Sequence, residues 1–286
     1  MGAFVPHVVV AAESLASDDP DAVVGSNIQV VNRLRAEALL ELEELSHDAL
    51  MSYYVDLYAA QVANGGFSQF VWNTCWDELL VGLVRDGLAA MGARRHAGAF
   101  EAGAAIVVRL GPDRLAAFLE GEYFGSPNPE REALNGVNDA IRDATREENL
   151  TALNDAWLRG RPDLVATDEA GLRRLVDQVS AAVPDHAERL ARAEREEPDY
   201  LKVVKALCAS AGHRFDQVTA GDPAFEYEGV RTIGWHFWTD RGHFVAVGPA
   251  AGGAVMLDAE SRAQVAELSP AAVAELVGEA GRAAPA

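Results

Sequence analysis

Hydrophobic residues in the first half of the chain recur at spacings of three and four, the period of an amphipathic helix. From about Ser26 this pattern predicts one helix, which carries Ile28, Val31, Leu34, Leu39, Leu42 and Leu45. Ser46-His47-Asp48 is typical of a helix cap and predicts the start of the next helix. That helix should end at Asn64-Gly65-Gly66, because a left-handed residue after a helix is least strained when it is Gly or Asn.

Further helical segments follow without an intervening strand pattern. They are Phe67–Asn73, Asp77–Met91, Arg94–Leu110, Pro112–Glu120 and a long stretch over Glu130–Arg159. Gly121–Pro129 contains two glycines and two prolines and is predicted to be a loop. Residues 27–165 are therefore expected to form an all-helical domain.

The pattern changes after Arg161-Pro162. Helices are predicted at Asp168–Val183 and Pro198–Ala211, and short strands at Phe225–Tyr227, Val230–Trp238, His243–Val247 and Ala254–Leu257. Turns are expected at Asp240-Arg241-Gly242 and Gly248–Gly253, and a last helix at Pro270–Val277 before an Ala/Gly-rich tail. The fold class is thus mainly α. It comprises a strand or extended arm (residues 1–26, with Phe4–Val10 β-branched), the all-α domain (27–165), and an α+β module with a short antiparallel sheet (166–286).

The chain is strongly acidic along its whole length. It has 44 acidic and 24 basic residues among 286, a net charge of −20. Residues 27–165 alone carry 21 acids and 12 bases, so the excess is not confined to a tail. This charge argues against direct binding to nucleic acid or an anionic membrane, since both attract Lys and Arg. No apolar run approaches the ~20 residues of a membrane span, and residues 1–12 lack a basic signal region, so we expect a cytoplasmic protein.

One acidic stretch is a candidate binding surface for a basic partner. Glu37, Glu41 and Glu44 are spaced by four and three residues and would lie on one helix face, with Glu43 nearby. Asp48 and Asp56 of the next helix extend this predicted face. An ordinary solvated helix face is the alternative interpretation. By contrast, Asp139 and Asp143 have arginines three residues further on, so that face should neutralise itself.

Motifs for catalysis or metal binding are weak. The two cysteines, Cys75 and Cys208, cannot make a four-cysteine zinc site, and no phosphate-binding loop, dinucleotide fingerprint or nucleophile elbow is present. We therefore expect no enzyme activity, no metal and no cofactor. The alternative from another class is an enzyme with its site in the C-terminal module, around Trp235, His236, Trp238 and His243. His236 alternates with Trp235 and Phe237 and should face the opposite side of its strand.

A more specific motif lies at the end of the predicted 47–66 helix. The run Tyr58–Asn73 reads YAAQVANGGFSQFVWN, and its distinctive residues are Asn64, Gly65, Gly66, Phe67, Gln69, Phe70, Trp72 and Asn73. Over roughly residues 27–165 the chain resembles the DNA mimic protein nineteen family, in which this motif is a hallmark. Ala89–Ala93 and Leu153–Trp157 are weaker matches to two later segments of that family and follow in the family's order. The motif itself has the character of a structural signature, in which Asn64 and Gln69 should hydrogen-bond backbone around the Gly-Gly turn.

The resemblance implies an all-α fold, a homodimer and a non-enzymatic role in regulating transcription. The partner it implies is a transcription factor or nucleoid protein, whose basic DNA-binding surface the acidic protein occupies in competition with DNA. An immunity or antitoxin protein that neutralises a basic nuclease toxin would need the same charge and stays open. So does a structural domain that is acidic for solubility alone.

Overall fold

In the computed structural model, residues 4–124, 127–248 and 252–278 are described. The chain divides into two compact units, residues 1–187 and residues 188–286. Each unit is described by itself below. Whether residues 27–165 fold as a domain of their own stays a prediction.

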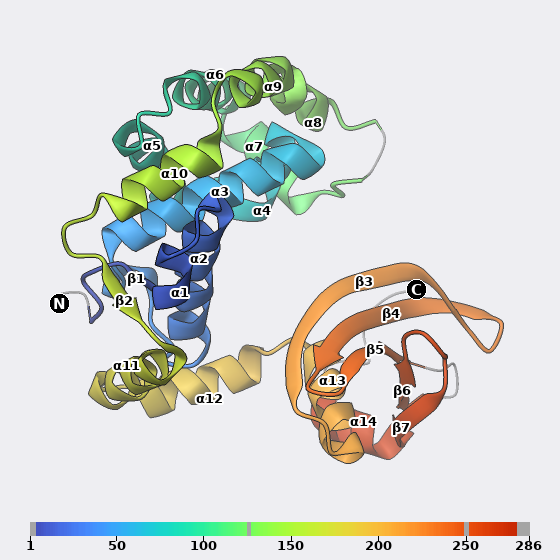
Figure 1. The fold of residues 1–286 in the computed structure, drawn as a ribbon. Coiled ribbons are helices and arrows are strands. Elements are labelled where there is room, and N and C mark those ends of the chain that lie inside the picture. The colour runs from blue at the N-terminus through green and yellow to red at the C-terminus, as the bar shows by residue number, and fades with distance from the viewer. Residues whose placement is uncertain (1–3, 125–126, 249–251, 279–286) are drawn as a thin grey trace. The chain divides into compact units, whose positions relative to one another are not determined.

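Unit 1 is a bundle of helices with one small sheet (Figure 1). Its first elements are β1 (Val9–Ala11), α1 (Ala12–Leu15), α2 (Pro20–Ala36), the 3-10 helix η1 (Leu42–Glu44), α3 (His47–Gly65), α4 (Phe67–Thr74) and α5 (Glu78–Ala90). They are followed by α6 (Arg94–Leu110), α7 (Pro112–Glu120), α8 (Pro129–Leu134), the 3-10 helix η2 (Asn135–Val137), α9 (Asn138–Glu147), α10 (Leu150–Arg159), β2 (Val165–Thr167) and α11 (Glu169–Ala182). Helix α12 (His186–Glu196) spans the boundary between the units.

The core of unit 1 is aromatic and centres on α3, α4 and α6. The largest fully buried rings are Tyr58, Phe67, Phe70 and Phe100. Phe70 lies with its ring centroid 5.6 Å from that of Tyr58 and 5.8 Å from that of Phe100, both edge-on. Edge-to-face pairs at this spacing add to the stabilisation that burial gives. The predicted apolar face of Phe67–Asn73 therefore forms part of the main core.

The N-terminal segment belongs to unit 1. Strand β1 pairs in parallel with β2, Val9 opposite Val165, and Val8 and Val10 are fully buried. The Arg159 guanidinium of α10 donates to the carbonyl oxygens of Leu15 and Ser17, at 2.7 and 2.8 Å. Of the predicted strand or extended arm over Phe4–Val10, only Val9 and Val10 lie in strand β1, and residues 12–26 contain α1 and the start of α2 instead of an arm.

Unit 2 is an α+β module in which a curled sheet contacts α13 (Figure 1). Its elements are α13 (Asp199–Ala211), β3 (Phe215–Tyr227), β4 (Val230–Thr239), β5 (Gly242–Val247), β6 (Ala254–Asp258), β7 (Gln264–Leu268) and α14 (Pro270–Val277). The strands form an antiparallel meander in the order β3-β4-β5-β6-β7. Leu207 of α13 packs with Phe237 and Met256 of the sheet. The mainly-α class with a small sheet module is confirmed; the turn at 248–253 and the tail lie partly or wholly outside the described residues.

Two expectations about helix length were wrong. The helix predicted from about Ser26 to Leu45 begins earlier, at Pro20, where Asp19 is the N-cap, and ends at Ala36. It ends there because the chain turns through Leu39 (φ 55°) to bury Ala38 and Leu40. The stretch predicted over Glu130–Arg159 is broken into α8, η2, α9 and α10. Asn149 starts α10 by accepting the Ala152 amide at 3.1 Å, which makes it a helix cap. Over the described residues, none of the helices combines the length and the apolar character that a membrane span requires.

Candidate partner-binding surface

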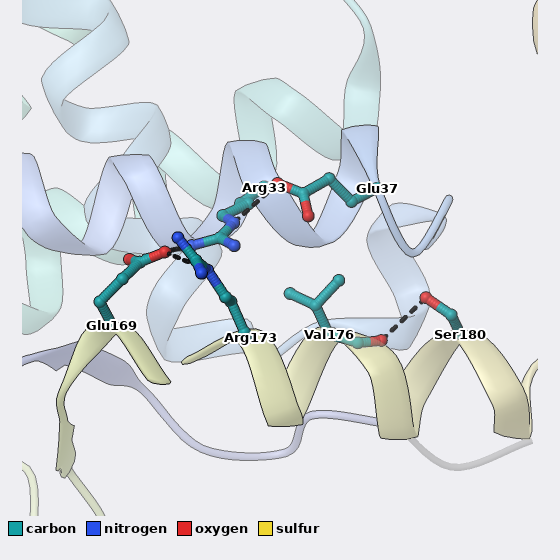
Figure 2. Close-up of polar contacts among 6 residues, drawn as sticks. All are labelled: Arg33, Glu37, Glu169, Arg173, Val176 and Ser180. Carbon is teal, nitrogen blue, oxygen red and sulfur yellow. Dashed lines mark hydrogen bonds and ion pairs between the residues drawn. The ribbon is translucent and has the colours of Figure 1, made fainter. Parts of the chain in front are cut away.

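The structure does not assemble the predicted acidic residues on one helix face. Glu37 lies just past the end of α2, where the Arg33 Nε donates to it at 2.7 Å. Arg33 also contacts Glu169 of α11 at 2.9 Å, and Glu169 accepts from Arg173 (Figure 2). Glu37 is thus one carboxylate of a mixed-charge network, which weakens its value for attracting a basic partner.

The other acidic residues of the predicted face are also not arranged along one helix. Glu41 and Glu44 form a reciprocal capping box around η1, and Glu44 is buried. Glu43 is exposed on η1, and Asp48 lies 3.5 Å from the Arg161 guanidinium. The expected stacking of Glu37, Glu41 and Glu44 was therefore wrong, although the binding role of these residues stays a prediction.

Helices α5 to α10 carry most of their charge in ion pairs. The pairs are Arg85–Glu101, Arg95–Glu147, Arg114–Glu130, Arg142–Asp139, Arg146–Asp143 and Arg159–Asp155. The self-neutralised face predicted around Asp139 and Asp143 is confirmed. Exposed pairs of this kind add little stability, but they lower the local negative potential.

A different group of carboxylates carries no ion pair among the described residues. It consists of Asp18, Asp19 and Asp21 at the start of α2, together with Asp56 of α3, and we call it the N-terminal acidic cluster. The first three are exposed and Asp56 is half-buried. Burial and the neighbouring negative charge of Asp21 raise the pKa of the Asp56 carboxyl. Both effects disfavour the charged form of Asp56 in the folded protein.

The glycine motif between α3 and α4 is held by residues that the sequence did not indicate. Gly66 has φ 82°, and a side chain there would collide with Asn135 and Asn138. These two asparagines accept the first amides of α4: Asn138 Oδ1 accepts Phe67 N–H and Asn135 Oδ1 accepts Ser68 N–H, both at 3.0 Å. The motif joins α4 to the η2–α9 segment, so its role in the structure is architectural.

The amides predicted to hold this turn behave differently. The Asn64 side chain is exposed and makes no hydrogen bond within the described part of the chain, so that expectation was wrong. The Gln69 side chain donates to Gln61 Oε1 at 2.7 Å, and Asn73 donates to the same oxygen at 2.6 Å. Gln69 therefore links side chains of α3 and α4, where a backbone partner was expected.

Unit 2 brings together the histidines of the alternative enzyme site. His236 Nδ1 lies 3.2 Å from His243 Nε2, and Trp238 stacks on His243 with ring centroids 5.0 Å apart. They line a cleft of about 450 Å³ with Asp258. Phe237 is buried and Trp235 packs against the same core, so His236 faces the opposite side, as predicted. No group of three or more potential metal ligands occurs among the residues that the structure describes.

Comparison with known proteins relates part of unit 1 to one protein family. Residues 43–161, from η1 to the loop after α10, match the family model of the DMP19-like proteins. This match confirms the resemblance drawn from the Asn64–Asn73 motif, over a somewhat shorter segment. Residues 1–42 and 162–187 of unit 1, and all of unit 2, lie outside this match. Neither the search of curated proteins nor the search of solved structures found a match.

Proposed function

We propose that unit 1 is a non-enzymatic binding domain that occupies the basic DNA-binding surface of a transcription factor or nucleoid protein. Its occupation of that surface would exclude DNA. The N-terminal acidic cluster is the part of the described surface that we assign to this contact. A surface evolved to hold phosphates attracts carboxylates through the same long-range Coulomb forces.

The observation that carries this proposal is the environment of Asp56. Burial disfavours the charged form of this half-buried carboxylate and raises its pKa, and the negative charge of Asp21 raises that pKa further. On α9, by contrast, Arg142 and Arg146 pair with Asp139 and Asp143. An acidic group left without a base destabilises the free protein and becomes favourable when a cationic partner binds.

The proposal is tested by competition with duplex DNA and by two variants that lose the same number of acidic charges at different places. The affinity-tagged full chain is incubated with lysate of its native host, and bound proteins are released with duplex DNA. The cluster variant carries Asp18→Asn, Asp21→Asn and Asp56→Asn and spares Asp19, whose side chain accepts the Asp21 amide in α2. The control variant removes the same charge at exposed positions on α7 and α8, by Asp113→Asn, Glu120→Gln and Glu132→Gln.

We expect a basic DNA-binding protein to be released by DNA from the wild type and the control, and to be lost from the cluster variant. Binding should weaken as salt rises, because charges at exposed surfaces are screened. Equal loss in both variants would show that net charge alone attracts the partner, which contradicts the assigned surface. Capture of a nuclease whose activity is blocked would favour the immunity or antitoxin alternative.

The unpaired environment of Asp56 also predicts a stability change. Because the folded-state pKa of Asp56 is raised, its ionised form destabilises the folded state at neutral pH. Asp56→Asn should therefore raise the melting temperature at pH 7. The gain should shrink as pH falls and Asp56 becomes protonated, and should vanish below about pH 3.9, where the unfolded carboxyl is protonated too. Thermal melts across this range measure it, and a lower melting temperature for Asp56→Asn at pH 7 would contradict the assignment.

An enzyme in unit 2 remains the second candidate, and the cleft beside His236 and His243 is the observation in its favour. A neutral imidazole paired with a second one is a reasonable general base. Screening the full chain against general hydrolase substrates, with His236→Ala as the matched control, tests it. An activity that His236→Ala abolishes would support a catalytic site in unit 2, and no activity in the wild type would speak against it.

A further inference from the structure

Unit 1 contains a cleft of about 750 Å³ that the proposed function does not use. It lies where the end of α3, the start of α6, α9 and the start of α10 meet, and Asn64 to Gly66 form part of its wall. Clefts of about 300–1,000 Å³ are typical of sites for small molecules. All of its lining residues belong to the segment that matches the DMP19-like family.

The most informative residue in this cleft is His96, whose side chain is only 2% exposed. Neither ring nitrogen has a hydrogen-bond partner within the described part of the chain. Burial lowers the pKa of the imidazole and outweighs the opposing effect of Glu148, so the ring is neutral at pH 7. A neutral imidazole has one donor and one acceptor to offer, and leaving both unpaired in a buried position destabilises the folded protein.

The position of His96 is fixed by the helix that carries it. Glu148 accepts the Arg95 and His96 amides at the start of α6, at 2.9 and 3.1 Å. Tyr58 lies on the other side, its ring edge-on to His96 with centroids 6.2 Å apart, and its buried hydroxyl also lacks a partner among the described residues. The local structure thus holds the His96 ring at the cleft, while its two nitrogens have no hydrogen-bond partner in the described part of the chain.

Two arginines in the lining favour an anion, and the Glu148 carboxylate, which also lines the cleft, is already engaged by the Arg95 and His96 amides. Arg142 and Arg146, one turn apart on α9, both line the cleft. Their ion pairs with Asp139 and Asp143 are exposed, so these pairs are weak and can be exchanged for a ligand. Helix α10 points its N-terminus at the cleft, where Leu150 and Thr151 line it, and helix N-termini attract negative charge.

The other lining residues favour an apolar group. Val62, Ile141 and Leu150 contribute side chains to the cleft. We propose that this cleft binds a small organic anion, whose apolar body packs on these three residues and whose carboxylate or phosphate lies between Arg142, Arg146 and the α10 N-terminus. His96 then hydrogen-bonds a polar atom of the ligand. This site is independent of the acidic cluster.

A His96→Phe variant is the central tool, because phenylalanine keeps a ring of similar size. Removing an unsatisfied buried polar group should leave the free protein folded and at least as stable. A histidine with a lowered folded-state pKa makes stability fall as pH drops below about 6.5, since the unfolded chain binds the proton more readily. Between pH 6.5 and 5, the melting temperature of His96→Phe should therefore fall less than that of the wild type.

Thermal melts with defined probes test the ligand class. The probes are benzoate and phenyl phosphate, with benzamide as the uncharged control and inorganic phosphate as the control without an apolar body. At ten times its dissociation constant, a binding probe should raise the melting temperature of unit 1 by about 3–5 °C. A shift with benzoate alone would indicate a carboxylate ligand, and a shift with phenyl phosphate alone would indicate a phosphate ligand. Shifts with both would show that the cleft accepts either group. No shift with either organic anion, or an equal shift with benzamide, would overturn the proposal.

Matched variants locate the binding. His96→Phe and the double variant Arg142→Gln with Arg146→Gln should each abolish the shift, whereas Arg109→Gln with Arg174→Gln, which removes two exposed charges elsewhere, should retain it. Ring ¹⁵N spectra of histidine give a second readout. The His96 signals, assigned by their absence in His96→Phe, should move when the probe is added. Shifts that persist in both cleft variants, or His96 signals that do not move, would show that the probe binds elsewhere.

Discussion

Phe70→Ala is expected to destabilise unit 1 by about 3–5 kcal/mol, the usual cost of removing a fully buried aromatic ring. Phe70 has no exposed surface, and its ring centroid lies 5.6–6.3 Å from those of Tyr58, Phe67, Trp76 and Phe100. Those rings come from α3, α4, the turn after α4, and α6. None of these helices can move inward alone to fill the space, so most of the cavity should persist.

Urea unfolding followed by circular dichroism measures this effect in the full chain. Phe124→Ala is the matched control, because that ring is 90% exposed and its removal should change stability by less than about 0.5 kcal/mol. A loss below about 1 kcal/mol for Phe70→Ala, or similar losses for both variants, would show that the aromatic core is not packed as described.

The sequence predicted the local part of this core but not its partners. The spacing of Phe67, Phe70 and Val71 indicated one buried helix face, and all three are buried. Nothing in the sequence indicated that Phe100, thirty residues further on, would complete the cluster. Periodicity reports which face of a helix is apolar, whereas the neighbour of that face depends on long-range packing.

The acidic face shows how periodicity can mislead. Leu39, Leu42 and Leu45 continue the helical spacing of α2, yet the helix ends at Ala36. The residues buried in this stretch include Ala38 and Leu40, which lie between the expected positions. Tertiary burial therefore outweighed the local helical spacing. Of the glutamates predicted on one helix face, Glu37 is the C-cap of α2 and pairs with Arg33, and Glu41 and Glu44 form a capping box around η1.

The candidate sites were harder to predict than the fold because they depend on contacts between distant segments. Asp21 and Asp56 are 35 positions apart, and only the packing of α2 on α3 makes their charges interact. The cleft likewise joins His96 to Arg142 and Arg146, which the sequence separates by more than forty residues. The sequence showed an excess of acid and a glycine motif, but not where either would act.

Gly66→Ala should be a strongly destabilising substitution in the DMP19-like segment. With φ 82° and ψ −174°, Gly66 adopts a conformation that is almost exclusive to glycine and that costs other residues about 1–3 kcal/mol. The added Cβ would also lie 2.6 Å from Asn135 Oδ1 and collide with Asn138. Displacing either asparagine removes a cap from the first turn of α4, which costs about 1 kcal/mol more.

We therefore expect Gly66→Ala to destabilise unit 1 by about 3 kcal/mol, measured by urea unfolding. Gly136→Ala is the matched control, because its Cβ would meet nothing within 4 Å and its change should stay within about 1 kcal/mol. The Asn138→Ala background separates the two causes. If the collision contributes, Gly66→Ala should cost less there than in the wild type; an equal cost would assign the whole effect to backbone strain. Gly66→Ala with wild-type stability would refute the description of this turn.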